Sequence, residues 1–189
     1  FLKILHDVLG EYGGLAEIEA FMSCRSGGMR EDIADMRGRR LVSAQEPSIS
    51  GSFAESTLKW VSGGDQLRAR RLWEHAQEFH PTHKLWLAVN RLPSLRLDDV
   101  AAWSRLRIIP FEVSFARSPN RGLKSELRAE LSGILNWALR GCHQWQQSGL
   151  GTVDAIEKAV HAHIGRKVHL YEPLQSSIGP TSIGRALLS

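Results

Sequence analysis

The sequence predicts an α/β fold in which a mainly parallel sheet is flanked by helices. Short apolar segments of strand type alternate along the chain with segments whose apolar residues keep helical spacing, and no internal repeat or low-complexity tract interrupts them. The 189 residues suffice for one domain with a sizeable core, and a composition of 42% apolar and 23% charged residues is that of a globular protein. No apolar run approaches the roughly 18–20 residues that a membrane span needs. No signal segment is recognisable either, so we expect no membrane partner and a cytoplasmic location.

In the first half of the chain, the predicted elements are helices over 1–9, 31–37 and 53–61 and a strand over 39–44. Apolar residues three and four positions apart predict the first helix, which Gly10 ends, with Gly13 and Gly14 as further breakers. Ser52 is expected to cap the third helix, because Glu55 three residues later completes a capping-box pattern.

In the second half, the predicted elements are a hairpin of two extended segments (67–73 and 78–80), strands over 84–89 and 107–109, and helices over 98–106, 124–147 and 153–163. The strand over 84–89 (KLWLAV) is almost entirely apolar, which is typical of a strand buried on both faces. Trp60, Trp86 and Trp137 are expected in the core. The chain after Ile164 has little periodicity and is predicted to be a loose tail.

Polar residues follow two of the predicted strands. Glu46 follows the strand over 39–44, and Asn90 follows the strand over 84–89. In open α/β sheets ligands bind beyond the carboxyl ends of the strands. An acid at such a place suits a magnesium–nucleotide site, because it holds the metal or polarises the attacking water, which a neighbouring Asn could orient. A lone Glu after a strand is more often a solvated charge or a cap, so the pair is the more informative signal.

Two arginines form the next candidate group. Arg105 and Arg107 would lie on one face of the chain if their segment is extended. A guanidinium group can neutralise charge that develops on a phosphoryl group during transfer, and a neighbouring subunit can supply it. The alternative is a pair of surface arginines in ordinary ion pairs.

A third group combines basic and aromatic side chains around Gly63 and Gly64. Such a mixture suits single-stranded nucleic acid, because the cations follow the phosphates while the rings stack on bases. A positively charged edge strand that discourages aggregation is an equally good interpretation. The net charge of +4 permits a nucleic-acid partner without requiring one. The residues of this group are Lys59, Arg68, Arg70, Arg71, Trp73 and His75.

Four segments in this order resemble one known family. CRSGGMREDIADMRGRRLVSAQE, LKWVSGGDQLRARRLW, FHPTHKLWLAVNRLP and AAWSRLRIIPFEVSF are similar to the helicase part of phage and plasmid primase-helicases, which belong to superfamily 3 of the AAA+ ATPases. The resemblance covers about residues 1–150 and fades from about Thr152. It implies a partial helicase ATPase domain over 1–150, followed by a helix and tail over 151–189.

The resemblance also implies roles for individual residues. Glu46 resembles the Walker B acid, Asn90 the sensor 1 residue and Arg105 the arginine finger, with Arg107 as a second candidate. Lys59 and Gly63-Gly64-Asp65 resemble the additional motif between Walker B and sensor 1, and 66–80 resembles the hairpin that reaches DNA in the central channel of the ring. The implied cofactors are ATP and Mg²⁺, with Glu46 as the metal ligand, and the implied partners are DNA and, for the intact protein, the further copies that form a homo-hexamer.

The sequence departs from the family pattern in two places. The GxxxxGK[ST] phosphate loop and the strand before it should precede Phe1, so we expect this chain alone neither to bind ATP tightly nor to hydrolyse it. The family often carries a second acid beside the Walker B acid, whereas Gln45 and Ser48 occupy the neighbouring positions here.

Two other classes of function stay open at this point. A truncated or decayed copy would act only as a passive DNA-binding or oligomerisation module. A P-loop ATPase that moves peptides or nucleotides would have no affinity for single-stranded DNA at low salt.

Overall fold

A computed structural model describes residues 1–23, 30–46, 52–90, 94–96 and 99–163. The chain forms two compact units, of which the larger comprises residues 1–105 and 113–151 and the smaller comprises 106–112 and the chain from residue 152. The predicted loose tail after Ile164 and the residue Ser48 lie outside the described residues. Among the helices that the structure describes, none is long and apolar enough to cross a membrane.

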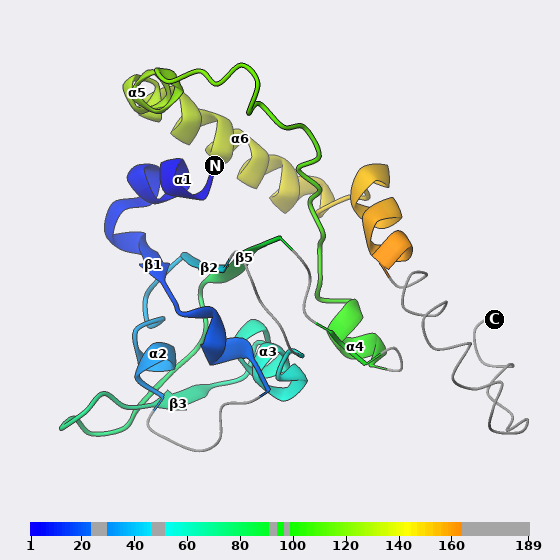
Figure 1. Cartoon of the computed structure of the whole chain (residues 1–189). Coiled ribbons are helices and arrows are strands. Elements are labelled where there is room, and N and C mark those ends of the chain that lie inside the picture. The colour runs from blue at the N-terminus through cyan, green and yellow to red at the C-terminus, as the bar shows by residue number, and fades with distance from the viewer. Residues whose placement is uncertain (24–29, 47–51, 91–93, 97–98, 164–189) are drawn as a thin grey trace, which may run out of the picture. The chain divides into compact units, whose positions relative to one another are not determined.

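A three-stranded parallel sheet forms the centre of the larger unit. Its strands are β1 (Gly13–Leu15), β2 (Leu41–Glu46) and β5 (Lys84–Val89), in the order β1-β2-β5 (Figure 1). β2 pairs along its whole length with β5, from Leu41 opposite Lys84 to Glu46 opposite Val89. The predicted α/β class with a mainly parallel sheet is therefore confirmed.

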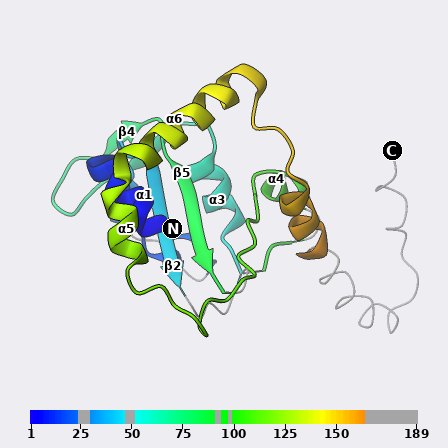
Figure 2. The ribbon, with the colours of Figure 1, turned by 90° about the horizontal axis from the view of Figure 1, so that it is seen from above.

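Helices cover both faces of this sheet. On one face lie α1 (Leu2–Leu9), which is the predicted first helix, and the pair α5 (Leu123–Ala129) and α6 (Leu131–Ser148). On the other face lie α2 (Glu31–Ala34) and α3 (Glu55–Ser62) (Figures 1 and 2). The most deeply buried apolar side chains are Phe21 of the 3-10 helix η2 (Ile18–Phe21), Ile33, Met36, Val42, Val61 and Leu67.

The strand β1 was not predicted, because two adjacent glycines indicated a break. After α1 the chain makes a single 3-10 turn, η1 (Gly10–Tyr12), and then pairs with β2. Gly13 has an ordinary extended φ of −86°, so its role is close approach and not backbone freedom. A Cβ at Gly13 would lie 2.5 Å from Nδ1 of His6, while Nε2 of the same ring is 2.7 Å from the hydroxyl of Ser43 on β2. The His6 ring thus joins α1 to the sheet, and a side chain at Gly13 would force this ring to move.

The predicted hairpin is present and shorter than expected. β3 (Leu67–Ala69) pairs antiparallel with β4 (Gln77–Phe79), with Leu67 opposite Phe79. The connecting residues 70–76 extend away from the sheet (Figure 1).

Five local predictions were wrong or incomplete. Ser52 does not cap α3: its hydroxyl is 2.7 Å from that of Ser23, and the helix has no side-chain cap. Residues 107–109 form no strand, because Pro110 follows and no strand in the described part of the chain pairs with them. The predicted helix over 124–147 is broken at Glu130 into α5 and α6. The helix predicted over 98–106 is shorter in the structure, where α4 comprises Val100–Trp103, and the helix predicted over 31–37 is likewise reduced to α2. By contrast, a helix over 154–163 matches the one predicted over 153–163 closely.

Candidate functional site at the carboxyl ends of the strands

The carboxyl ends of β2 and β5 bring the two strand-end candidates together. Glu46 is the last residue of β2 and pairs with Val89, the last residue of β5, which Asn90 follows directly. Neighbouring strands lie about 5 Å apart, so the two backbones are adjacent at this edge. Asn90 is exposed. The structure describes the backbone of Glu46 but not its side chain, and Gln45 beside it is exposed.

Arg105 ends the turn that closes α4. Its backbone N–H donates to the carbonyl of Ala102 at 3.2 Å, and its Nη1 donates to the carbonyl of Ala101 at 2.6 Å. The side chain is exposed. Arg107 lies in the irregular segment beyond, where its Nη1 donates to the carbonyl of Leu106. Arg105 still belongs to a helical turn, so the condition under which the two guanidinium groups would share one face, an extended segment, is not met.

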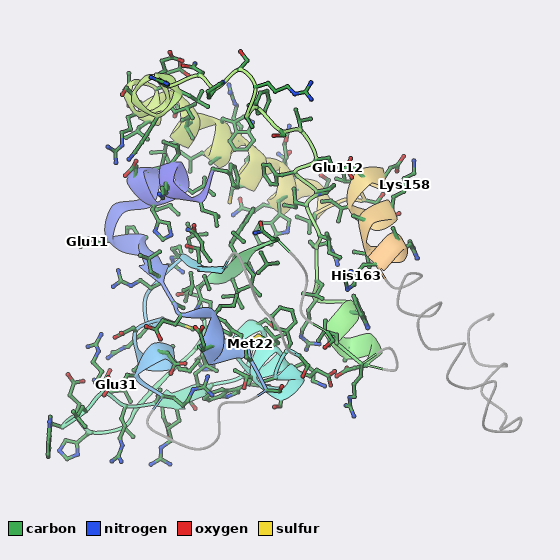
Figure 3. All side chains as sticks on the ribbon, viewed as in Figure 1. Glu11, Met22, Glu31, Glu112, Lys158 and His163 are labelled. Atoms are coloured by element: carbon green, nitrogen blue, oxygen red, sulfur yellow. The ribbon has the colours of Figure 1, made fainter. Side chains whose placement is uncertain are left out.

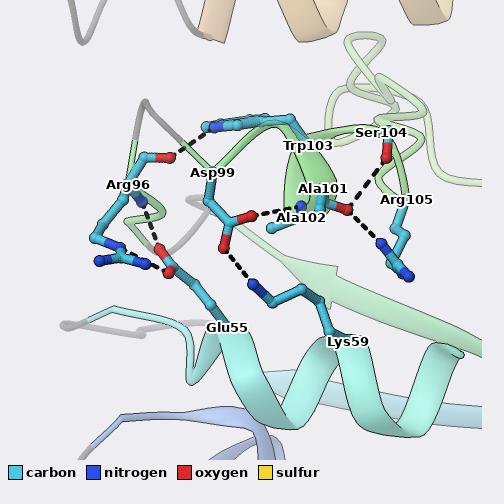
Figure 4. A network of polar contacts seen from close by, with 9 residues as sticks. All are labelled: Glu55, Lys59, Arg96, Asp99, Ala101, Ala102, Trp103, Ser104 and Arg105. Atoms are coloured by element: carbon cyan, nitrogen blue, oxygen red, sulfur yellow. Dashed lines mark hydrogen bonds and ion pairs between the residues drawn. The ribbon is translucent and has the colours of Figure 1, made fainter.

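Lys59 lies on α3 and forms an ion pair. Its Nζ is 2.7 Å from Oδ2 of Asp99, whose side chain is only 7% exposed (Figure 4). The hydrogen bond from Lys59 is the main cause that lowers the pKa of Asp99 below its ordinary value, and the Ala102 N–H adds to it. Asp99 was not among the residues predicted from sequence. The available signal was an N-cap pattern, because its Oδ1 accepts the N–H of Ala102 three residues later at 3.0 Å.

The hairpin carries most of the predicted basic and aromatic residues, and they differ in their surroundings. Arg68 is well exposed and lies 3.8 Å from Glu78 on the opposite strand. Arg70 is exposed and has no ion pair with any residue that the structure describes. Trp73 is 94% exposed and has a φ of 64°, in the left-handed region that a bulky residue seldom adopts. His75 is exposed as well.

Acidic side chains of α2 and its C-terminal turn hold the hairpin. Nε of Arg71 is 2.7 Å from Oδ1 of Asp35, and this contact is the main cause that raises the pKa of Arg71. The backbone N–H of Leu72 donates to Oε1 of Glu31 at 2.8 Å; Glu31 is labelled beside the hairpin in Figure 3. Arg37 also bonds to the side chain of Gln77. The hairpin is thus fixed at its arms, while Trp73 projects beyond these contacts.

The described residues contain no group of three or more His, Cys, Asp or Glu that could hold a metal ion by itself. A magnesium ion that is bound mainly by substrate phosphates and water needs only one or two protein carboxylates. A single acid at the end of β2 is compatible with that kind of site.

The fold and the strand-end residues define an α/β protein with a candidate ligand site at the carboxyl edge of its sheet. Comparison with known proteins is more specific. The chain is 35% identical over 86 residues to "Putative helicase L207/L206" of Acanthamoeba polyphaga mimivirus, which covers 46% of the chain and 9% of that protein. It is 35% identical over 81 residues to "Putative helicase 022R" of Frog virus 3, covering 41% of the chain and 8% of the relative. It is 37% identical over 92 residues to "Putative helicase 121R" of Invertebrate iridescent virus 3, which covers 47% of the chain and 9% of the relative.

These matches support a relationship to viral proteins named as helicases. They span less than half of this chain and under a tenth of each relative, and no family model matches the chain.

Proposed function

We propose that the chain is part of an ATP-dependent DNA helicase of superfamily 3, of the AAA+ type found in primase-helicases of mobile genetic elements. The observation that carries this proposal is the parallel pairing of β2 and β5 along their whole length. Because of it, the backbones of Glu46, the last residue of β2, and Asn90, the residue after β5, lie at the same edge of the sheet. The similarity to viral proteins named helicases supports it independently.

In this proposal, ATP and Mg²⁺ bind at that edge. Glu46 holds the metal or polarises the attacking water, and Asn90 orients that water by hydrogen bonding. A strand and a GxxxxGK[ST] loop before Phe1 supply the amides and the lysine that bind the phosphates. The edge of β5 that faces away from β2 has no partner strand among the described residues, which leaves room for such a strand.

Arg105 acts on the nucleotide of an adjacent subunit in a hexameric ring. Its exposed side chain at the end of α4 supports a role toward a partner, because a group that serves its own subunit's nucleotide would be enclosed there. Arg107 is exposed as well and is the second candidate for this role.

The hairpin binds single-stranded DNA. Arg68 and Arg70 supply charge for the phosphates, while the ring of Trp73 offers a stacking surface for one base. His75 is a further polar contact. The Arg71–Asp35 ion pair and the hydrogen bond from Leu72 to Glu31 support this role, because a loop that is held in place loses less conformational entropy when DNA binds.

The first test measures ATP hydrolysis by a longer chain that includes the upstream phosphate loop, with and without single-stranded DNA. We expect DNA-stimulated turnover that Glu46→Gln and Arg105→Ala each reduce by several orders of magnitude, on the scale of about 10³ or more seen when arginine fingers are lost. Glu157→Gln and Arg117→Ala replace exposed residues of the same types and should leave turnover unchanged. Turnover that survives Glu46→Gln would refute the assigned site.

The second test measures DNA binding by this chain. Trp73→Ala should weaken binding to single-stranded DNA by about 1–3 kcal/mol, or roughly 5- to 150-fold in Kd, because one stacked base is lost. Trp137→Ala, at a tryptophan that is 60% exposed on α6, is the matched control. Equal affinities of Trp73→Ala and the unchanged chain would remove the hairpin from the DNA interface.

A passive DNA-binding module is the second candidate. The observation that favours it is that the hairpin and its attachment to α2 are complete within the described chain. DNA binding without any ATP turnover by the longer chain would make this the better description. ATP turnover without affinity for DNA at low salt would instead indicate an ATPase that moves another substrate.

A further inference from the structure

Two ion pairs join one face of α3 to the segment that leads into α4. Lys59 pairs with Asp99 at 2.7 Å, and Glu55 accepts both Nε of Arg96 at 2.8 Å and its backbone N–H at 2.7 Å (Figure 4). Glu55 and Lys59 are four residues apart, so they lie on the same face of the helix, one turn from each other. α3 therefore binds the segment before α4 at two residues, Arg96 and Asp99, which are three positions apart.

Asp99 connects this attachment to α4. One carboxylate oxygen accepts a hydrogen bond from the Lys59 ammonium group, the other accepts one from the N–H of Ala102, and the backbone carbonyl of Asp99 accepts one from the N–H of Trp103 at 3.1 Å. A carboxylate that is 93% buried is costly without a counter-charge, and removal of one partner of such a pair leaves the other uncompensated. Lys59 is thus the group that allows Asp99 to cap α4.

Arg105 depends on the same network through a very short helix. α4 has four residues, which is too few to form a stable helix by itself, so external contacts must fix it. One such contact is the bond from Nε1 of Trp103 to the carbonyl of Arg96 at 2.9 Å. Arg105 then bonds to the last turn of α4 through both its backbone and its side chain.

We propose that Lys59 is a positioning residue: through Asp99 it fixes α4 and thereby the place of Arg105, and it does not contact DNA. This inference rests on the proposed function of Arg105, and it changes the role that the sequence predicted for Lys59. The short contact with Asp99 and the one-third exposure of the Lys59 side chain are the features that distinguish it from Arg70.

The first measurement separates positioning from DNA contact in this chain. We expect Lys59→Met to speed amide hydrogen exchange over residues 99–105 as much as Asp99→Asn does, with no further increase in the double variant. Its affinity for single-stranded DNA should stay unchanged, whereas Arg70→Ala should lose affinity. Lys84→Met, at an exposed lysine on β5, is the control for loss of a positive charge. Lys59→Met with weaker DNA binding and unchanged exchange would overturn the inference.

The second measurement uses turnover by the longer chain with its phosphate loop. Lys59→Met should lower kcat with little change in KM for ATP, and Lys59→Arg should restore part of the loss because it keeps the charge. In an Arg105→Lys background with residual turnover, Lys59→Met should add little, since both changes act through the same group.

Two results would count against the inference, and they are distinguishable. If Arg105→Ala leaves turnover unchanged, the proposed function of Arg105 fails and the inference fails with it. If Arg105→Ala abolishes turnover while the effect of Lys59→Met is multiplicative with that of Arg105→Lys, only the positioning role is overturned.

Discussion

At the scale of single residues, the described chain separates basic side chains that hold the fold from those that remain available. Arg39 is an example of the first kind: it donates to the backbone carbonyls of Gly13 at 3.2 Å and of Glu11. Lys59 is paired with a buried acid, whereas Arg70 is exposed. A count of positive charges in the sequence cannot make this distinction, because it depends on acids and carbonyls that lie 20–40 residues away in the chain.

His83 is the residue with the clearest expected pH response. It is 6% exposed, and neither ring nitrogen has a hydrogen-bond partner at good geometry in the described part of the chain. Burial lowers its pKa below the ordinary value of 6.5, and the backbone of Val61 offsets only part of this effect. A lowered pKa means that the unfolded chain takes up a proton first, so stability falls as the pH drops below about 6.5, until the folded pKa is reached.

The measurement is the free energy of unfolding by urea between pH 7.5 and pH 5. We expect the unchanged chain to lose stability relative to His83→Leu over this range, by up to about 1.4 kcal/mol per pH unit within the window. His75→Leu, at an exposed histidine, should keep the pH dependence of the unchanged chain. A constant difference between His83→Leu and the unchanged chain would show that His83 does not titrate differently in the folded state.

At the scale of elements, periodicity predicted the existence of most helices and strands, and contacts between distant residues decided their ends. The strand over 84–89 was predicted with the correct first and last residues. Five of its six residues are apolar, and polar residues lie on both sides of it in the sequence. β1 was missed because its two glycines are set by side chains from elsewhere in the chain, the His6 ring at Gly13 and Arg39 at Gly14, which a sequence pattern does not reveal. Ser52 was assigned as a cap, but Glu55 binds Arg96 and so is unavailable for a capping box.

The candidate site shows the same division. Its strand-end residues were found from the sequence, because the carboxyl end of a strand can be located from its pattern alone. The partner of Lys59 was not found, because Asp99 reaches it only after the chain has crossed the sheet through β5. The burial predicted for Trp137 was wrong as well: it is 60% exposed on α6, although its neighbours keep helical spacing.

The hairpin gives the prediction that belongs to this scale. Arg71 already pairs with Asp35, whereas Arg70 is free of ion pairs with the described residues. We expect Arg70→Ala to lose more affinity for single-stranded DNA than Arg71→Ala, and to reduce the slope of log K against log salt by about 0.7. Arg71→Ala should instead speed amide exchange over residues 70–77. Equal losses of affinity in the two variants would mean that Arg71 leaves Asp35 to bind DNA.

At the scale of the whole molecule, β5 is an edge strand of the sheet that the structure describes. The strand was predicted to be buried on both sides, yet Leu85, Trp86 and Leu87 are only half-buried. The physical reason is that β5 pairs with β2 alone, so its second edge has no strand among the described residues. An apolar strand with an open edge is a template for pairing with another chain.

This open edge leads to a prediction about chain length. If a further strand precedes Phe1 as proposed, a longer chain that includes it should pair with β5 and bury its apolar side chains. We expect the longer chain to show a higher Tm and slower amide exchange over 84–89 than the 189-residue chain.

The shorter chain should also self-associate as its concentration rises, and the longer chain should do so less, which sedimentation velocity measures. Lys84→Pro is not a useful control, since the N–H of Lys84 bonds to the carbonyl of Arg40 on the β2 side. Unchanged exchange over 84–89 in the longer chain would mean that the upstream segment lies elsewhere, and the phosphate loop with it.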